Sequence, residues 1–207
     1  MQAGRRHFLA AGPLPISQQA FRRATMANPS ARDRILDTAA RLFYQEGYRA
    51  TGIDRIIAES GVAKMSLYRH FASKNDLISA FLDRRHEEWM AWFRGDVEAR
   101  LAARPHLDVI ADALADWFAA DFRGCAFINV VAEAGGDARA AAQAAAHKAE
   151  LAAFVADIAT RLGLRQPVQV AEEAMLCIEG MIVRYQMHRD PAVIEAGRRL
   201  LGRLQGE

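Results

Sequence analysis

The chain of 207 residues has only two cysteines, Cys125 and Cys177. Two thiols are too few for the disulfide framework of a small secreted protein, and a chain of this length buries a core without one. The sequence also lacks an apolar run of about 18 residues, the length that crosses a bilayer. We therefore expect a soluble protein of the reducing cytoplasm, with no membrane partner.

The common enzyme motifs are missing as well. The sequence has no Gly-x-Ser-x-Gly element, phosphate-binding loop or dinucleotide fingerprint. Its six histidines show no short-spaced pairing with one another or with cysteine. We expect no catalytic residue, no metal and no cofactor, and an all-helical enzyme assembled from distant residues is a less favoured alternative.

Acidic residues are absent from residues 62–75, inside a cationic first part of the chain. The first 75 residues hold 12 Lys and Arg against 5 Asp and Glu, whereas the rest holds 15 against 20. Such a division is typical of a protein that meets a polyanion at one end, although uneven solvation gives the same counts.

Local signals predict short helices in the first part. Ser30, Thr51 and Ser73 each stand three residues before an aspartate, as in a capping box, where the hydroxyl accepts from an unpaired backbone amide. Gly47 ends the first helix, and Gly61 supplies a tight turn between the second and third helices. The apolar positions that follow at helical spacing include Ile35, Ala39, Leu42, Phe43, Val62, Leu67 and Phe71.

The second part shows no strand-like alternation and is rich in Ala and Leu. A long helix is expected from Ser73 through Leu82 and on toward Phe93, followed by about five more helices. The last two should cover about Val168–His188 and Pro191–Leu204. The expected breaks lie near Gly95, Pro105, Gly124, Gly135, Gly163 and Pro191.

A short helix, a glycine turn and a second short helix with a cationic face predict a helix-turn-helix between about Thr51 and Phe71. A helix of about 10 to 12 Å diameter fits the major groove of B-DNA, and this motif braces one helix there with another. The alternative is a helical hairpin inside a core. Against it, the second helix gathers basic and hydroxyl side chains with no acidic one, whereas a solvated helix usually mixes both signs.

Residues 50–56, ATGIDRI, and 61–74, GVAKMSLYRHFASK, strongly resemble the DNA-binding domain of TetR-family (tetracycline-repressor-like) regulators. The resemblance extends over about Ala31 to Leu82. It combines a threonine near the second helix, a glycine in the turn, Leu-Tyr-x-His-Phe in the third helix and Ser-Lys at the start of the fourth.

Residues 1–29 show no sustained apolar periodicity and are expected to form a flexible extension. The resemblance implies an all-α fold, with a three-helix DNA-binding domain at 30–75 and a helical effector-binding and dimerisation domain at 76–207. The physiological first residue is hypothesised to be Met26. Two sets of side chains would meet DNA, one at the phosphates and one near the bases. The phosphate set is Thr51, Ser66, Tyr68, His70 and Lys74, and the base set is Lys64, Met65 and Arg69.

Two residues depart from the family pattern. Ala63 stands where a helix-capping Ser or Thr is common, so that cap is missing. Met65 stands where a small residue is common, and it could instead pack against a thymine methyl group.

The second part is expected to hold a pocket and a subunit interface. Residues 123–129, RGCAFIN, resemble a segment of many family members, and Cys125 is expected to be a buried structural thiol rather than a redox sensor. The last two helices predict a four-helix seam in a homodimer, although the same residues could close the chain's own core. The seam residues are Ala174, Ile178, Met181, Ile182, Ile194, Leu200, Leu201 and Leu204. The pocket candidates are Trp89, Phe93, Trp117, Phe118, Phe127 and Asn129, although aromatic residues at helical spacing are more often core.

The expected function is that of a ligand-responsive transcriptional regulator. It would bind a double-stranded, pseudo-palindromic operator as a repressor and leave it when a small molecule binds. A DNA-architectural or interaction protein without an effector is the alternative.

Overall fold

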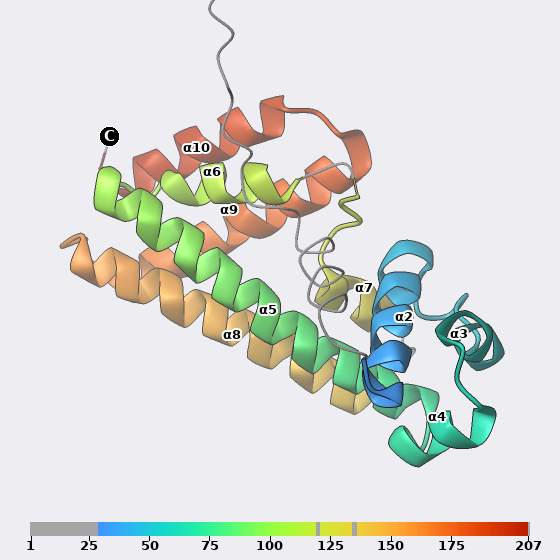
Figure 1. Ribbon diagram of the computed structural model, residues 1–207. Coiled ribbons are helices and arrows are strands. Elements are labelled where there is room, and N and C mark those ends of the chain that lie inside the picture. The colour runs from blue at the N-terminus through green and yellow to red at the C-terminus, as the bar shows by residue number, and fades with distance from the viewer. Residues whose placement is uncertain (1–28, 119–120, 134–135, 207) are drawn as a thin grey trace, which may run out of the picture.

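The computed structural model describes residues 29–118, 121–133 and 136–206, and over these ranges it is all helical (Figure 1). The prediction of an all-α fold is confirmed. Most of the expected extension, with Met26, lies outside the described residues. The helices are α2 (Ala31–Glu46), α3 (Ile53–Ser60), α4 (Lys64–His70), α5 (Lys74–Ala103), α6 (Val109–Trp117), α7 (Ala126–Glu133), α8 (Ala138–Arg161), α9 (Pro167–His188) and α10 (Ala192–Leu204).

Two of the three predicted capping boxes are confirmed. The Ser30 hydroxyl accepts from the Asp33 amide at 3.2 Å and donates to the Asp33 carboxylate at 2.7 Å. Ser73 and Asp76 make the same pair of bonds at the start of α5, at 3.1 and 2.8 Å. The third box is wrong, because α3 begins after Gly52 and has no side-chain cap.

Helices α2, α3 and α4 form a head around the predicted apolar residues, all of which are buried. The first turns of α5 complete its core. Phe81 contacts the rings of Phe43 and Tyr48, with centroids 6.0 and 5.9 Å away. The boundary expected between residues 75 and 76 therefore falls inside a helix that packs on both parts.

Helix α5 runs unbroken through Gly95, so the break predicted there is wrong. Gly95 is exposed, while Phe93 and Val97 on either side of it are fully buried. A glycine inside a helix costs about 1 kcal/mol, and burying one large apolar side chain offsets that cost. Tertiary packing therefore overrides the local signal.

Helices α5 to α10 form the body, and the five helices after α5 match the prediction. Helix α5 lies alongside α8, α9 packs between α8 and α10, and α6 lies against α5 and α10 (Figure 1). Helix α7 packs on α8 and faces the head. None of the described helices has the length and apolar character needed to cross a membrane.

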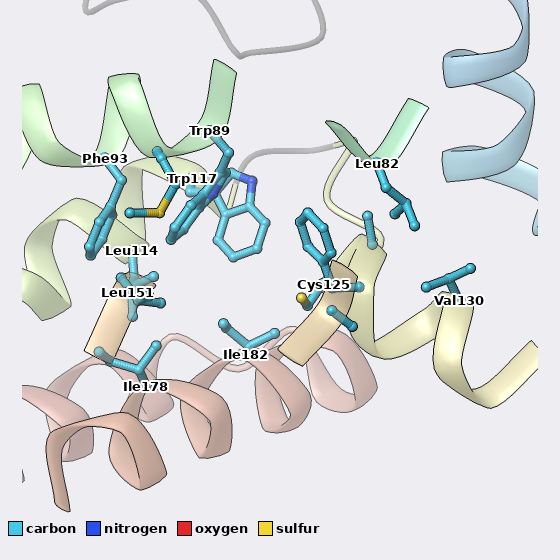
Figure 2. Packing of buried hydrophobic residues seen from close by; sticks show 14 of the residues in the cluster. Leu82, Trp89, Phe93, Leu114, Trp117, Cys125, Val130, Leu151, Ile178 and Ile182 are labelled. Carbon is cyan, nitrogen blue, oxygen red and sulfur yellow. The ribbon is translucent and has the colours of Figure 1, made fainter. Parts of the chain in front are cut away.

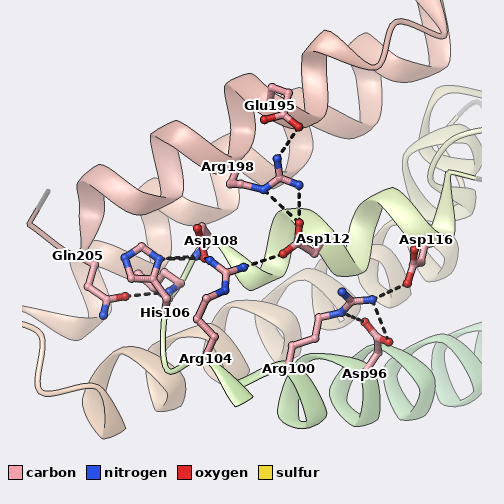
Figure 3. A network of polar contacts seen from close by, with 11 residues as sticks. Asp96, Arg100, Arg104, His106, Asp108, Asp112, Asp116, Glu195, Arg198 and Gln205 are labelled. Atoms are coloured by element: carbon pink, nitrogen blue, oxygen red, sulfur yellow. Dashed lines mark hydrogen bonds and ion pairs between the residues drawn. The ribbon is translucent and has the colours of Figure 1, made fainter. Parts of the chain in front are cut away.

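Arginine and aspartate side chains join α5, α6 and α10 at the end of the body remote from the head (Figure 3). Asp112 of α6 accepts from Arg104 at 2.7 Å and from Arg198 of α10 at 2.5 Å. The side chain of Gln205 accepts from the Leu107 amide at 2.8 Å and donates to the Pro105 carbonyl at 3.2 Å. These contacts hold α6 between α5 and α10.

A pair of histidines joins α5 to α8 inside the body. The Nδ1 atoms of His86 and His147 are 3.0 Å apart, and His86 Nε2 lies 3.0 Å from the Glu150 carboxylate. The His147 ring is stacked on Phe127 at 3.9 Å. Burial, with nearby cations, lowers the pKa of His147 to about 3, so this side chain stays neutral in the folded protein.

This depressed pKa predicts a pH-dependent stability that His147→Gln removes. Between pH 6.5 and about 4 the unfolded chain binds a proton at His147 that the folded chain refuses. The free energy of unfolding of the wild type should therefore fall, relative to that of the variant, by about 1.4 kcal/mol per pH unit as the pH is lowered. Urea titrations at pH 7.0, 5.5 and 4.5 measure this difference. The control is the exposed residue His188, as His188→Gln; parallel profiles of wild type and His147→Gln would contradict the assignment.

Candidate nucleic-acid interface and effector cavity

The turn between α3 and α4 holds the two helices at a fixed angle. Gly61 has φ 64° and ψ 30°, a left-handed conformation that favours glycine, as the sequence predicted. Ile56 of α3 and Leu67 of α4 are both fully buried in the head. The backbone of the turn and the core together fix how α4 is presented.

Helix α4 turns one face to solvent. Met65 is 78% exposed and Tyr68 is 45% exposed, and Lys64 and Arg69 are exposed beside them. Lys64 and Tyr68 are four residues apart, as are Met65 and Arg69, so the side chains of these two pairs share one side of the helix. Buried Leu67 points to the opposite side. The face combines two cations, a phenol and a thioether.

Some cations of the head are paired with carboxylates and others are not. Arg55 of α3 bonds Glu59 at 2.7 Å and Glu46 at 2.8 Å, and Arg41 of α2 also contacts Glu59. Lys64 of the α4 face lies 3.4 Å from the Asp54 carboxylate, whereas Arg69 makes no ion pair with any residue that the structure describes. Arg69 therefore leaves its positive charge available to a ligand.

The remaining predicted DNA-contacting residues lie at the edges of this face. His70 is exposed at the end of α4, and Ser66 is half-buried with its amide 2.8 Å from the Ala63 carbonyl. Ala63 caps α4 without a side-chain bond, as expected. Lys74 is half-buried at the start of α5, where burial lowers its pKa and the charge of Glu133 acts in the opposite direction.

Thr51 does not join this set. Its side chain is fully buried, and its hydroxyl donates to the Gly47 carbonyl at 2.8 Å. The bond closes the loop between α2 and α3, so the hydroxyl neither caps α3 nor is available to a phosphate in this structure. The expected phosphate contact from this side chain is corrected to a structural role.

A small cavity lies in the body among α5, α6, α7, α8 and α9. Its volume is about 10 Å³, room for about one water molecule. Three of the six pocket candidates line it: Trp89, Trp117 and Phe127. Figure 2 shows Trp89 and Trp117 in this core, with Leu151 and Ile182 across from them.

The other three candidates lie elsewhere. Phe93 is stacked behind Trp89 at 4.6 Å, and Phe118 is stacked on Tyr185 at 4.4 Å. Asn129 lines a separate polar cleft between head and body, where its side chain donates to the Arg123 carbonyl at 3.0 Å. These three side chains are not part of the cavity wall.

Sequence analysis missed the polar residues of the cavity. Arg85, His147 and Lys148 line it, and Cys125 is buried in the same wall, as expected for a structural thiol. His86 and His147 meet although they are 61 residues apart in the chain, so no short motif could reveal them. One local signal was present: Arg85 stands four residues, about one helical turn, after the buried residue Phe81, so the two side chains lie on the same face of α5. Among the described residues no group of three or more His, Cys, Asp or Glu could hold a metal ion.

Two tyrosines of the head bind the segment that leads into α7. The Tyr48 hydroxyl donates to the Ala126 carbonyl at 3.0 Å, and the Tyr44 hydroxyl donates to the Gly124 carbonyl at 3.1 Å. The Tyr44 hydroxyl also accepts from the Arg123 amide at 3.0 Å. The same short segment thus contacts the head on one side and the cavity on the other.

Comparison with known proteins addresses both parts of the chain. A model of the tetR family of bacterial regulatory proteins matches residues 35–81. The HTH-type transcriptional activator FasR of Mycolicibacterium smegmatis is 32% identical over 93 residues, 45% of this chain and 42% of that protein. The HTH-type transcriptional repressor ComR of Escherichia coli is 37% identical over 89 residues, 43% of this chain and 40% of that protein. The chain thus matches less than half the length of these curated relatives.

Solved structures match over a longer range. A TetR-family transcriptional regulator from Streptomyces coelicolor has a TM-score of 0.75 and 28% identity, covering 93% of this chain and 97% of its own. A putative tetR-type regulator from Streptomyces avermitilis has a TM-score of 0.64 and 27% identity, covering 84% and 97%. The match over residues 35–81 shows that the head is a DNA-binding domain of the tetR family of bacterial regulatory proteins, and the described chain as a whole is similar in fold to these regulators.

Proposed function

We propose that this protein is a cytoplasmic, homodimeric transcriptional repressor that binds operator DNA through α4 and is released by a small molecule. The observation that carries the proposal is the exposed face of α4, which holds Lys64, Met65, Tyr68 and Arg69. The head braces that face beside a turn fixed by Gly61. A helix presented in this way fits the major groove.

The proposed contacts divide into two kinds. Ser66, Tyr68 and His70 donate hydrogen bonds to phosphates, and Lys74 neutralises one. Lys64, Met65 and Arg69 lie on the part of α4 that would enter the groove, so they would read base edges. Met65 supplies apolar contact, because its side chain is exposed and makes no contribution to the core of the head.

Dimerisation is proposed through α9 and α10, but through other residues than the sequence indicated. Ala174, Ile178, Met181, Ile182 and Leu201 are buried in the chain's own core, so their assignment to a seam is wrong. Helix α9 instead carries several exposed apolar residues on one side, and Leu200 of α10 lies in a groove of about 400 Å³ beside them. That side carries Val168, Leu176, Gly180, Val183 and Met187.

A second copy of the chain is the proposed occupant of this surface. Two copies related by a two-fold axis would bury both apolar faces in a four-helix arrangement. The same symmetry would place two α4 helices in successive major grooves of a pseudo-palindromic site. A dimer covering such a site would keep other proteins from the same DNA, which supports repression.

Release by an effector requires differential binding. A small molecule lowers DNA affinity only if it binds the arrangement that does not fit DNA more tightly than the one that does. The cavity in the body and the tyrosine contacts to the head supply two sites that such a change would link. The effector's place is therefore proposed in the cavity.

Lys74→Gln should weaken binding to DNA chosen from a random pool by the wild type. Loss of one phosphate contact per chain should lower the slope of log K against log salt by about 0.9 per chain. Fluorescence anisotropy at several salt concentrations measures it. The matched control is Arg165→Gln, an exposed cation on the body. Equal slopes for wild type and Lys74→Gln would remove Lys74 from the interface, and equal binding of all sequences by the wild type would favour a DNA-architectural protein.

Met65→Ala should lower affinity for the selected sequence several-fold while leaving affinity for unrelated DNA unchanged. An apolar contact to a thymine methyl contributes only where that base is present, whereas phosphate contacts do not depend on sequence. Competition between selected and unrelated duplexes measures the ratio. A uniform loss on both duplexes would contradict base contact by Met65.

Gly180→Glu should convert the dimer to a monomer without unfolding it. No atom of the described chain lies within 4 Å of the position that a Cβ would take at Gly180, so the monomer accommodates the new side chain. A carboxylate at the centre of the proposed interface would be buried without a partner. Sedimentation velocity gives the mass and circular dichroism the fold. Gly95→Glu, an equally open glycine on α5, should remain dimeric, and a dimeric Gly180→Glu would place the interface elsewhere.

A further inference from the structure

The cavity in the body is walled by flat rings. Trp89, Trp117, Phe127 and the ring of His147 line it. Trp89 and Trp117 meet edge to face with centroids 5.4 Å apart, and His147 is stacked on Phe127. These rings contact one another directly around a cavity of about 10 Å³, so a ligand ring enters only by displacing them, and it would then stack on their faces. A flexible acyl chain offers no flat face for such stacking.

One donor in this wall has no acceptor. The indole Nε1 of Trp89 is fully buried and makes no hydrogen bond with any described residue. A buried N–H without a partner destabilises the fold, so such groups are normally paired. The indole would be satisfied by an acceptor atom on a ligand.

The charges of the lining are positive. Arg85 and Lys148 line the cavity, and no aspartate or glutamate does. Lys148 lies 3.4 Å from the Glu179 carboxylate, whereas Arg85 forms no ion pair with any part of the chain that the structure describes. The Arg85 guanidinium instead lies over the Tyr44 ring, 4.7 Å from its centroid. His147 adds no charge, because it is neutral.

We propose that the cavity binds a planar aromatic carboxylic acid whose carboxylate pairs with Arg85 and whose ring lies among Trp89, Trp117 and Phe127. The proposal deepens the proposed function and rests on it for the link to DNA. A guanidinium binds a carboxylate through two parallel hydrogen bonds, which a single ammonium cannot match. Such a ligand supplies a ring to stack on the aromatic side chains, an acceptor for the unpartnered N–H and an anion for the unpaired cation.

Arg85 also connects the cavity to the DNA-binding head. Tyr44 belongs to α2, and its hydroxyl holds the segment before α7 at Gly124 and Arg123. A carboxylate that engages Arg85 removes the guanidinium from the Tyr44 ring. A ring that enters the cavity also pushes on Ala126 and Phe127, next to the carbonyl that binds Tyr48. Both movements weaken the same attachment of the head.

The experiment is direct calorimetric titration of the full chain with five probes. Three are aromatic acids of increasing size, benzoate, indole-3-carboxylate and 1-naphthoate. The other two are the uncharged indole-3-carboxamide and the non-aromatic octanoate. At least one aromatic acid should bind with one site per chain, at least tenfold more tightly than its amide. Octanoate should bind more weakly than the aromatic acid. Equal affinity for acid and amide, tighter binding of octanoate, or no binding of any aromatic acid would overturn the proposal.

Two variants test the assigned contacts. Arg85→Gln should lose at least tenfold in affinity for the acid and leave affinity for the amide unchanged, which a mere folding defect would not do. Trp89→Phe keeps a ring and removes the N–H, and it should weaken binding several-fold. Arg165→Gln is the control for charge alone. An Arg85→Gln protein that binds the acid like the wild type would refute the role of Arg85.

DNA binding is measured in parallel on the same preparations. Binding of selected DNA without binding of any aromatic acid would refute this inference and leave the proposed DNA-binding function intact. Acid binding without DNA binding would refute the proposed function and leave the cavity assignment standing. Where both occur, saturating acid should release DNA from the wild type and not from Arg85→Gln, and release from both would remove Arg85 from the link.

Discussion

The attachment of the head to the body depends on two phenolic hydroxyl groups. Tyr44 and Tyr48 donate to the carbonyls of Gly124 and Ala126, and burial raises the pKa of both phenols, so both keep their donor protons. Each bond satisfies a backbone carbonyl near the N-terminal end of α7. Without them the three small helices would be joined to the body mainly through α5, and the orientation of α4 would not be tied to the state of the cavity.

The amount of unpaired positive charge on the head depends on its ion pairs as well as on its composition. The first 75 residues carry an excess of Lys and Arg, yet Arg41 and Arg55 are matched by Glu46 and Glu59 on α2 and α3. Exposed ion pairs contribute little to stability, about 0 to 1 kcal/mol each. Their effect here is to offset the charges of Arg41 and Arg55, whereas Arg69 on α4 makes no ion pair with any described residue.

The sequence predicted those features that depend on neighbours along the chain. Ser30 and Ser73 cap helices because the bonded groups are three residues apart, and the positive φ of Gly61 follows from a turn between two short helices. Thr51 carried the same capping pattern, but burial turned its hydroxyl toward Gly47. A local motif indicates which hydrogen bonds a side chain can form, and tertiary packing determines which of them is present in the folded protein.

Features that depend on packing could not be predicted in this way. Helix α9 has apolar residues on two sides, and periodicity could not tell that Ile178 faces the core while Leu176, 74% exposed, faces solvent. Arg85 and His147 meet in the cavity wall from helices far apart in sequence. Phe93 and Phe118 are aromatic like Trp89 and Trp117, and of these four side chains the backbone places the two tryptophans in the cavity wall.

Helix α5 is unbroken over its whole length, so a small tilt at one end displaces the other end by several ångströms. Thirty residues at about 1.5 Å each span roughly 45 Å, from Lys74 in the head to Ala103, just beyond Arg100 of the ion-pair network. A tilt of about 5° about the distant end would carry Lys74 by about 4 Å, more than the roughly 3.4 Å between successive base pairs. A small tilt at the far end of α5 is thus enough to move Lys74 by a full step of the double helix.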